Sequence, residues 1–350
     1  PGERAVFLDL QPPPMLRVVQ IETEIAVQEV LVDNSDDPYL LELLTPGFSA
    51  LTVAGPFTKL GLGGLELRGD QFFLDQLLLD EGNLLANNAT TIELDSLTVG
   101  SPTMGPAALD LDGGSSLIAT SVNLVSGDLA VRGGSSVSAI LPVTADAGTM
   151  VTVEDGMSRF DADLTLQGAT LRGEGMVTGT LTNSGTVRRG HSPGTLTVDG
   201  TYNQQSTGLL QLEFADSVPG QFSTLDVVGN TSGTANLDGT LEVIVEPTFT
   251  ATSGTFQVIN TSSGHLGTFD SVATIGNDDI FFAPDYAGSA TAVSLSVFVE
   301  GDMDTDGSLE PVDDVQWFVT ALRNRDTYFN MFGVEADFSG DIDDNGLFDF

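Results

Sequence analysis

The sequence predicts an all-β protein: a right-handed β-solenoid (β-helix) with a β-rich capping region and a small α-helical tail. Three observations favour this class. The 40 glycines indicate many tight turns. Short apolar segments with period-2 alternation end repeatedly at glycine, as strands do. The segment LDLDGGSSL at 109–117 returns 20 residues later as LAVRGGSSV at 129–137, and this period suits one solenoid turn.

The predicted strands between about residues 50 and 200 share the alternating, glycine-terminated form. They are ALTVAG (50–55), LELRG (65–69), TIELDSLTVG (91–100), LDLDGG (109–114), LAVRGG (129–134) and TLTVDG (195–200). A β-sandwich with hairpins shows similar short strands, so the sandwich stays open as an alternative. The apolar spacing at 24–34 and 72–86 would also suit helices, but the strands around these segments favour strands there as well.

Three regions are expected along the chain. Residues 1–185 are predicted to form the solenoid, 186–299 a capping or sandwich region, and 300–350 the tail. In the middle region, large side chains recur at even spacing, which puts one face inward: these are Tyr202, Leu210, Leu212 and Phe214. A cap of this kind would cover the edge strands of the solenoid.

Charge and composition exclude several classes of function. Fifty acidic residues stand against 11 basic ones, a net charge of −39, which disfavours nucleic acid and anionic membranes and favours bound cations. The absence of cysteine excludes disulfides and thiolate sites. No apolar run is long enough to span a bilayer. We expect a piece of a longer precursor, because the chain starts without Met and its last residues stop inside a motif.

That motif is an acidic loop with the spacing of an EF-hand-type calcium site. Such a loop takes oxygen ligands at positions 1, 3, 5, 7 and 12, with glycine at position 6. Counting from residue 302, the predicted ligands are Asp302, Asp304, Asp306, the carbonyl of Ser308, and Asp313. Gly307 falls at position 6 and Leu309 at position 8, where an apolar side chain points into the core. The spacing therefore predicts Ca²⁺, since a hard cation prefers such an oxygen shell.

A helix and a second loop follow. Apolar residues fall at i, i+3, i+4 and i+7, which predicts one helical face made of Val315, Phe318, Val319 and Leu322. The sequence GDIDDNGLFDF then repeats the loop at 340–350 with an offset of 39 residues. Its predicted ligands are Asp341, Asp343, Asn345 and the carbonyl of Leu347, and the chain stops before position 12.

The duplicated loop and helix resemble dockerin type I repeats. The resemblance implies calcium binding. It implies binding to a cohesin-like protein less directly, because Pro311 and Val312 stand where cohesin-binding dockerins usually carry small or basic residues. The repeat offset is also longer than usual, through the insertion DTYFNMFGVEAD.

The region from 171 to 301 resembles the C-terminal part of autotransporter-like and PEP-CTERM-type exported β-helix proteins of planctomycete type. The matching pieces follow one another in order at 190–202, 204, 226, 239–243, 254–259 and 267–269. Arg188 and Arg189 depart from the family pattern, which affects a local turn. The resemblance implies export and a repetitive β-structure, and it does not imply catalysis.

Two functional readings follow. The first is a secreted or cell-surface structural or adhesive protein, not an enzyme, whose calcium-stabilised tail attaches it to a cohesin-like or other surface protein, or to further copies in filaments. The second is an extracellular protein that binds or degrades polysaccharide, by analogy with β-helix enzymes. Other candidate side chains are isolated: His191 and His265 lie 74 residues apart, Trp317 flanks the predicted helix, and Asp161 and Asp163 alternate along a strand.

Overall fold

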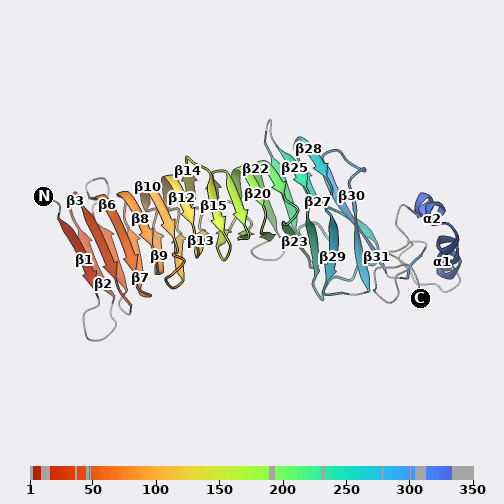
Figure 1. The fold of residues 1–350 in the computed structure, drawn as a ribbon, viewed down its shortest axis with the longest axis horizontal. Coiled ribbons are helices and arrows are strands. Elements are labelled where there is room, and N and C mark those ends of the chain that lie inside the picture. Colours follow the sequence, from red (N-terminus) through yellow and green to blue (C-terminus); the bar gives the residue numbers. More distant parts are fainter. Residues whose placement is uncertain are drawn as a thin grey trace.

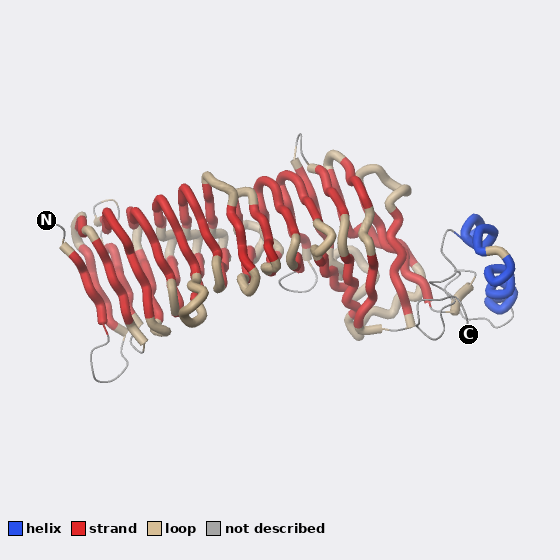
Figure 2. The backbone as a smooth tube through the Cα atoms, viewed as in Figure 1, coloured by secondary structure: helices blue, strands red, loops and turns tan. Residues whose placement is uncertain are grey.

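The computed structural model describes residues 3–8, 16–35, 38–44, 47, 49–188, 194–229, 233–277, 279–299, 301–303 and 313–332. These residues form mostly strands, with two helices near the C-terminus, so the prediction of an all-β protein is confirmed. Figure 1 shows the strands side by side along the long axis of the molecule, with helices α1 and α2 beyond β31. The tube in Figure 2 shows the same long stack of strands, joined by short turns for most of its length.

The described strands belong to two sheets. The 12-stranded sheet contains β2 (Arg17–Ile21), β5 (Tyr39–Leu43), β7 (Gly64–Arg68), β9 (Gly82–Asn87), β11 (Ala107–Leu111), β13 (Asp128–Val131), β16 (Met150–Val153), β19 (Thr170–Gly173), β21 (Thr186–Arg188), β23 (Leu209–Phe214), β26 (Thr240–Val245) and β29 (Ser271–Ile275). The 19-stranded sheet contains β1 (Arg4–Leu8), β3 (Ile25–Val27), β4 (Glu29–Asp33), β6 (Ala50–Leu60), β8 (Gln71–Leu79), β10 (Thr91–Val99), β12 (Ser116–Leu124), β14 (Ser136–Ala139), β15 (Val143–Asp146), β17 (Arg159–Asp161), β18 (Leu164–Gln167), β20 (Met176–Asn183), β22 (Thr195–Gln204), β24 (Thr224–Val228), β25 (Thr234–Leu237), β27 (Gly254–Thr261), β28 (Gly264–Gly267), β30 (Ile280–Asp285) and β31 (Ala292–Val299).

The chain passes from one sheet to the other and back, and the strands before β30 and β31 pair with one another in parallel ladders. From β8 to β13, successive strands alternate between the sheets, and each pairs with the next strand of its own sheet. The sequence repeat sets this register, since Leu109 of β11 pairs with Leu129 of β13. Likewise Ser116 pairs with Ser136, so the whole repeat unit stacks on itself. The segments 24–34 and 72–86 are strands, as their neighbours predicted.

The long strands of the larger sheet bend around the core. In β8, Leu74 and Leu77 are both buried while Asp75 between them is exposed, so the two-residue alternation slips by one position. The ladder between β8 and β10 skips Asp75 and Asp95 at this point. Further along, the two halves of the bent strand, its arms, become separate strands. β12 pairs with β14 through its first half and with β15 through its second. Both arms thus direct apolar side chains at one interior.

That interior is a single hydrophobic cluster, which extends from Ile21 to Val299. Every second residue of the strands contributes to it, as the period of a strand requires. The parallel ladders also run across residue 185, because β20 pairs with β22 from Met176 to Asn183. The expected division between a solenoid at 1–185 and a capping region at 186–299 stays a prediction.

Antiparallel pairing closes the C-terminal end of the stack. β31 pairs antiparallel with both β27 and β30, whereas the ladders before it are parallel. Beneath these strands, five phenylalanines pack with ring centroids between 4.9 and 6.4 Å apart: Phe214, Phe222, Phe249, Phe256 and Phe282. We call these five side chains the phenylalanine cluster.

Buried hydroxyl groups bond one coil to the next at the turns that precede β10, β12 and β14. The amide of Thr90 donates to Ser115 Oγ at 3.1 Å, and the amide of Ser115 donates to Ser135 Oγ at 3.0 Å. Ser115 Oγ in turn donates to the carbonyl of Asp112 at 2.7 Å. In the same turn Gly113 has a φ of +62°, a conformation that favours glycine. The GGSS of the repeat therefore encodes both the turn and its hydrogen bonds.

Replacing Ser115 by alanine is expected to destabilise the protein by about 1–3 kcal/mol, because the buried amide of Thr90 loses its acceptor. Thermal unfolding and hydrogen exchange at the Thr90 amide measure this loss. Ser116→Ala is the matched control, since Ser116 is half-buried and its hydroxyl bonds only Ser136 Oγ, at 3.3 Å. Equal losses in the two variants would contradict the assigned role of the Ser115 hydroxyl.

The described part of the tail contains two helices, α1 (Asp313–Arg323) and α2 (Arg325–Phe332). The predicted helix after the acidic loop is present, but its predicted apolar face is wrong in three of four positions. Phe318 is buried with Ala321 and Tyr328, whereas Val315, Val319 and Leu322 are exposed. Met303, the second residue of the loop, joins the same small core. Packing on Met303 and α2 thus turns a different stripe of the helix inward.

Candidate metal loop and surface pocket

The acidic loop starts directly after the last strand of the stack. The amide of Asp302 donates to the carbonyl of Val299 in β31 at 3.1 Å, so the first predicted ligand is held against the end of that strand. Asp302 is 1% exposed. Burial of a carboxylate costs free energy unless hydrogen bonds or a cation compensate for it. The oxygen chemistry of Asp302 fits a hard cation such as Ca²⁺.

The two ends of the loop lie next to each other. The amide of Met303 donates to Asp314 Oδ1 at 2.8 Å, which joins the start of the loop to the first turn of α1. Asp313, the predicted position 12, is the first residue of α1. The backbone of the loop therefore brings its first and last predicted ligand residues close together, as a loop that wraps an ion requires.

Asp314 was not predicted as part of the site. Its side chain is buried, and it accepts the Met303 amide. A carboxylate in the first turn of a helix is favourable because the unpaired amides there carry partial positive charge. An acidic residue in the first turn of a helix is visible in the sequence, but the sequence does not show that its carboxylate bonds to the start of the loop.

The remaining predicted ligands lie outside the described residues. They are Asp304, Asp306 and Ser308 of the first loop, and Asp341, Asp343, Asn345 and Leu347 of the second. The structure therefore brings together Asp302 and the start of α1, and the other ligands stay predictions.

The tail carries one ring contact that reports on its folding. Trp317, the single tryptophan of the chain, packs edge-on against Phe332 with ring centroids 5.0 Å apart. Tyr328 also packs on Phe332 at 5.0 Å. Trp317 thus belongs to the contact between α1 and α2, and its fluorescence is a local probe of the tail.

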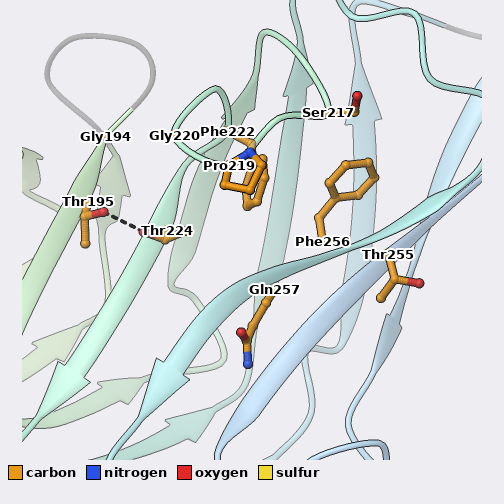
Figure 3. Close-up of a pocket in the computed structure, with 10 residues that line it drawn as sticks. All are labelled: Gly194, Thr195, Ser217, Pro219, Gly220, Phe222, Thr224, Thr255, Phe256 and Gln257. Atoms are coloured by element: carbon orange, nitrogen blue, oxygen red, sulfur yellow. Dashed lines mark hydrogen bonds between the residues drawn. The ribbon is translucent and has the colours of Figure 1, made fainter.

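A pocket of about 400 Å³ lies near the C-terminal end of the stack, where β22, β24 and β27 begin and where the first half of β27 pairs with β31. One side is formed by the turn residues Ser217, Pro219 and Gly220 (Figure 3). The rest of the lining is Phe222 of the same turn, Gly194 just before β22, and the strand residues Thr195, Thr224, Thr255, Phe256 and Gln257. The hydroxyls of Thr195 and Thr224 bond each other at 2.7 Å.

The paired aspartates at 161 and 163 take part in bonds between neighbouring coils. Asp161 Oδ1 accepts from Thr178 Oγ1 at 2.7 Å and from Arg159 Nε at 3.3 Å. Asp163 Oδ1 accepts from the amide of Thr180 at 2.6 Å. These contacts agree with the interpretation of both residues as parts of the strand stacking.

His265 Nε2 lies 3.1 Å from the carbonyl of Ser289, and the His265 ring packs 6.2 Å from that of Tyr286. His191 lies outside the described residues. In the part of the chain that the structure describes, no group of three or more histidine, aspartate or glutamate side chains converges as a metal site would. The candidate metal loop extends beyond that part.

No protein-family model matches the chain, and no curated protein matches it at a significant level. Neither helix of the described tail is long and apolar enough to cross a membrane. The resemblances to exported β-helix proteins and to dockerin repeats therefore stay expectations from the sequence.

Proposed function

We propose that this chain is a secreted or cell-surface structural protein of a bacterium, a right-handed β-solenoid whose calcium-stabilised tail attaches it to a partner. The observation that carries this proposal is the buried Asp302, which is bonded to the end of β31 and lies beside a residue bonded to α1. Calcium bound there would fix the tail to the end of the stack. The long stack with a continuous core supports a role as a spacer or stalk.

The solenoid interpretation rests on three features. The chain alternates between two parallel sheets, the long strands bend so that both arms face one interior, and the repeat unit stacks on itself in register. In such a fold each coil buries its apolar face against its neighbours only. The resulting molecule is long and stiff for its chain length, which suits a surface structure.

Attachment through the tail is supported by its exposed apolar side chains. Val315, Val319 and Leu322 follow one another at helical spacing on α1, and 57% of Val315 is exposed. Phe329 and Met331 of α2 are exposed too. A cohesin-like protein, another surface protein or a second copy of the tail would bury this stripe. Catalysis is not part of the proposal.

Calcium binding is tested on the full chain by titration with Trp317 fluorescence as the readout. We expect a saturable spectral change with a dissociation constant on the order of 10⁻⁴ to 10⁻³ M, the range of extracellular sites of this kind. Asp302→Asn is expected to weaken binding about tenfold or more, because the site loses one charged ligand. Sedimentation velocity in calcium and in chelator then shows whether the tail compacts or assembles.

Asp75→Asn is the matched control, because Asp75 is an exposed carboxylate at a strand bend far from the tail in sequence. It should bind calcium as the unchanged chain does. Magnesium at the same concentration should give a weaker response, since it requires stricter geometry. The calcium site would be refuted if the Trp317 spectrum did not change during the calcium titration and the sedimentation profiles in calcium and in chelator were the same.

A further inference from the structure

The pocket beside the phenylalanine cluster arises where parallel pairing gives way to antiparallel pairing. Residues 259–261 of β27 pair with β24, but residues 254–257 pair only with β31. The first half of β27 therefore diverges from β24. The turn at 215–223 lies in the opening, held by the amide of Gln221, which donates to the carbonyl of Val218 at 2.9 Å.

The floor of this pocket is formed by packed aromatic rings. Phe222 and Phe256 pack with ring centroids 5.4 Å apart, and both rings contact Phe214 below them at 5.3 Å. A backbone bridge between Phe214 and Phe222 holds the turn in place. The pocket is thus formed by packed side chains before any ligand binds, as is usual for small-molecule sites.

The lining is uncharged. In a chain with 50 acidic residues, the described residues that line this pocket include no carboxylate and no basic group. They supply one amide from Gln257, exposed apolar surface from Pro219, and four hydroxyls. These hydroxyls bond within the protein and keep acceptor lone pairs: Thr195 bonds Thr224, Thr255 bonds Ser296 Oγ at 3.1 Å, and Ser217 donates to Asp216 Oδ1 at 3.2 Å. Gln257 is exposed on β27, and its amide has both donors and an acceptor to offer a ligand.

We propose that this pocket binds an uncharged sugar unit of a glycan. A sugar presents hydroxyls that both donate and accept, which match the threonine, serine and glutamine side chains, and C–H faces that pack on the exposed Pro219. The volume of about 400 Å³ lies in the range of small-ligand pockets. Acidic sugars and phosphates are disfavoured, because the described lining residues offer them no cation and the protein's net charge repels them.

The inference does not depend on the calcium tail, because the pocket is formed by strands β22, β24 and β27 and by the turn at 215–223. If calcium does not bind the tail, the proposal for the sugar pocket is unaffected. If no sugar binds the pocket, the calcium proposal is likewise unaffected. Sugar binding would give the proposed surface protein a second contact, on the side of its stack.

The test is isothermal calorimetry of the full chain with two sets of tetrasaccharides. The uncharged set contains glucose, xylose, mannose and N-acetylglucosamine oligomers, and the acidic set contains oligogalacturonate and oligomannuronate. We expect saturable, millimolar binding of at least one uncharged oligomer and none of the acidic ones. Gln257→Ala should weaken that binding about three- to tenfold, the effect of losing one or two hydrogen bonds.

Gln167→Ala is the matched control, since Gln167 is also an exposed strand glutamine but lies on β18, outside the pocket. It should leave the affinity unchanged. A second pocket variant, Pro219→Ser, removes apolar surface from the exposed turn and should also weaken binding. Equal thermal stability of all variants would show that the folds are intact. No binding of any uncharged oligomer, equal binding by Gln257→Ala, or preference for the acidic set would each overturn the inference.

Discussion

Replacing Phe214 by alanine is expected to destabilise the C-terminal end of the stack by about 3–5 kcal/mol, the cost of emptying a buried aromatic site. Phe214 is fully buried at the centre of the phenylalanine cluster, and its ring lies 4.9 Å from that of Phe282. Its strand, β23, also pairs with β26 from Leu209 to Phe214. The cavity would therefore remove contacts from the turn at 215–223 and from the closing strands together.

The expected loss is local, because each strand of the stack pairs only with its neighbours. Hydrogen exchange should show faster exchange in β27, β30 and β31, with β8, β10 and β12 still protected. Phe160→Ala is the matched control: Phe160 is equally buried, but it lies in β17 near the middle of the stack. It should affect β14, β17 and β20 instead. Uniform loss of protection in both variants would contradict the picture of local cooperativity.

Replacing Gln204 by leucine is expected to destabilise the protein by at least about 3 kcal/mol, because several buried polar groups lose their partner at once. Gln204 Oε1 accepts from Asn183 Nδ2 at 3.0 Å and from the hydroxyl of Tyr202. Its Nε2 donates to the carbonyls of Gly208 at 3.1 Å and Thr240 at 2.9 Å. Gln204 thus joins three successive coils through one side chain.

The Tyr202 hydroxyl is a donor in this network at every ordinary pH. Burial raises the pKa of Tyr202 well above its usual value, although the bond from Asn183 acts in the opposite direction. The variant Tyr202→Phe removes this donor, so it should cost less in the Gln204→Leu background than alone. Strictly additive losses in the double variant would show that the two side chains do not interact.

A matched control for Gln204→Leu is Gln211→Leu. Gln211 lies in β23 and is half-buried, and its amide bonds only Glu242 on the neighbouring strand. Its replacement should change the free energy of unfolding by less than about 1 kcal/mol, since surface groups regain water as a partner. Chemical unfolding followed by circular dichroism compares the two variants directly. A Gln211→Leu loss as large as that of Gln204→Leu would remove the special role of the network.

The strands and the repeat were predictable from the sequence. Period-2 alternation predicts which side chains are buried within each half of β8 and β10, because a strand places alternate residues on opposite faces. The shift by one residue at Asp75 and Asp95 comes from the bend in the ladder. The 20-residue repeat predicted that Leu109 would align with Leu129, as it does. The acidic loop was predictable in the same way, since its ligand spacing is a local property of the chain. Its full set of ligands remains a prediction.

The face of α1 was decided by tertiary structure. Two stripes of this helix have the same spacing: Val315, Val319 and Leu322 on one, and Asp314, Phe318 and Ala321 on the other. Hydropathy favours the first stripe. The structure buries the second, because Asp314 binds the amide of Met303 and Phe318 packs with Met303 and Tyr328. Contacts outside the helix outweighed its own apolar pattern.

The pocket and the Gln204 network were beyond sequence reasoning for the same physical reason. Thr195, Ser217 and Gln257 are far apart in the chain and meet only because β27 leaves β24 to pair with β31. Gln204 and Thr240 meet only because successive coils stack. Local alternation determined which residues of this protein form strands and which of them face inward. Long-range pairing decided where the parallel ladder ends, and with it where uncharged side chains surround the pocket beside the phenylalanine cluster.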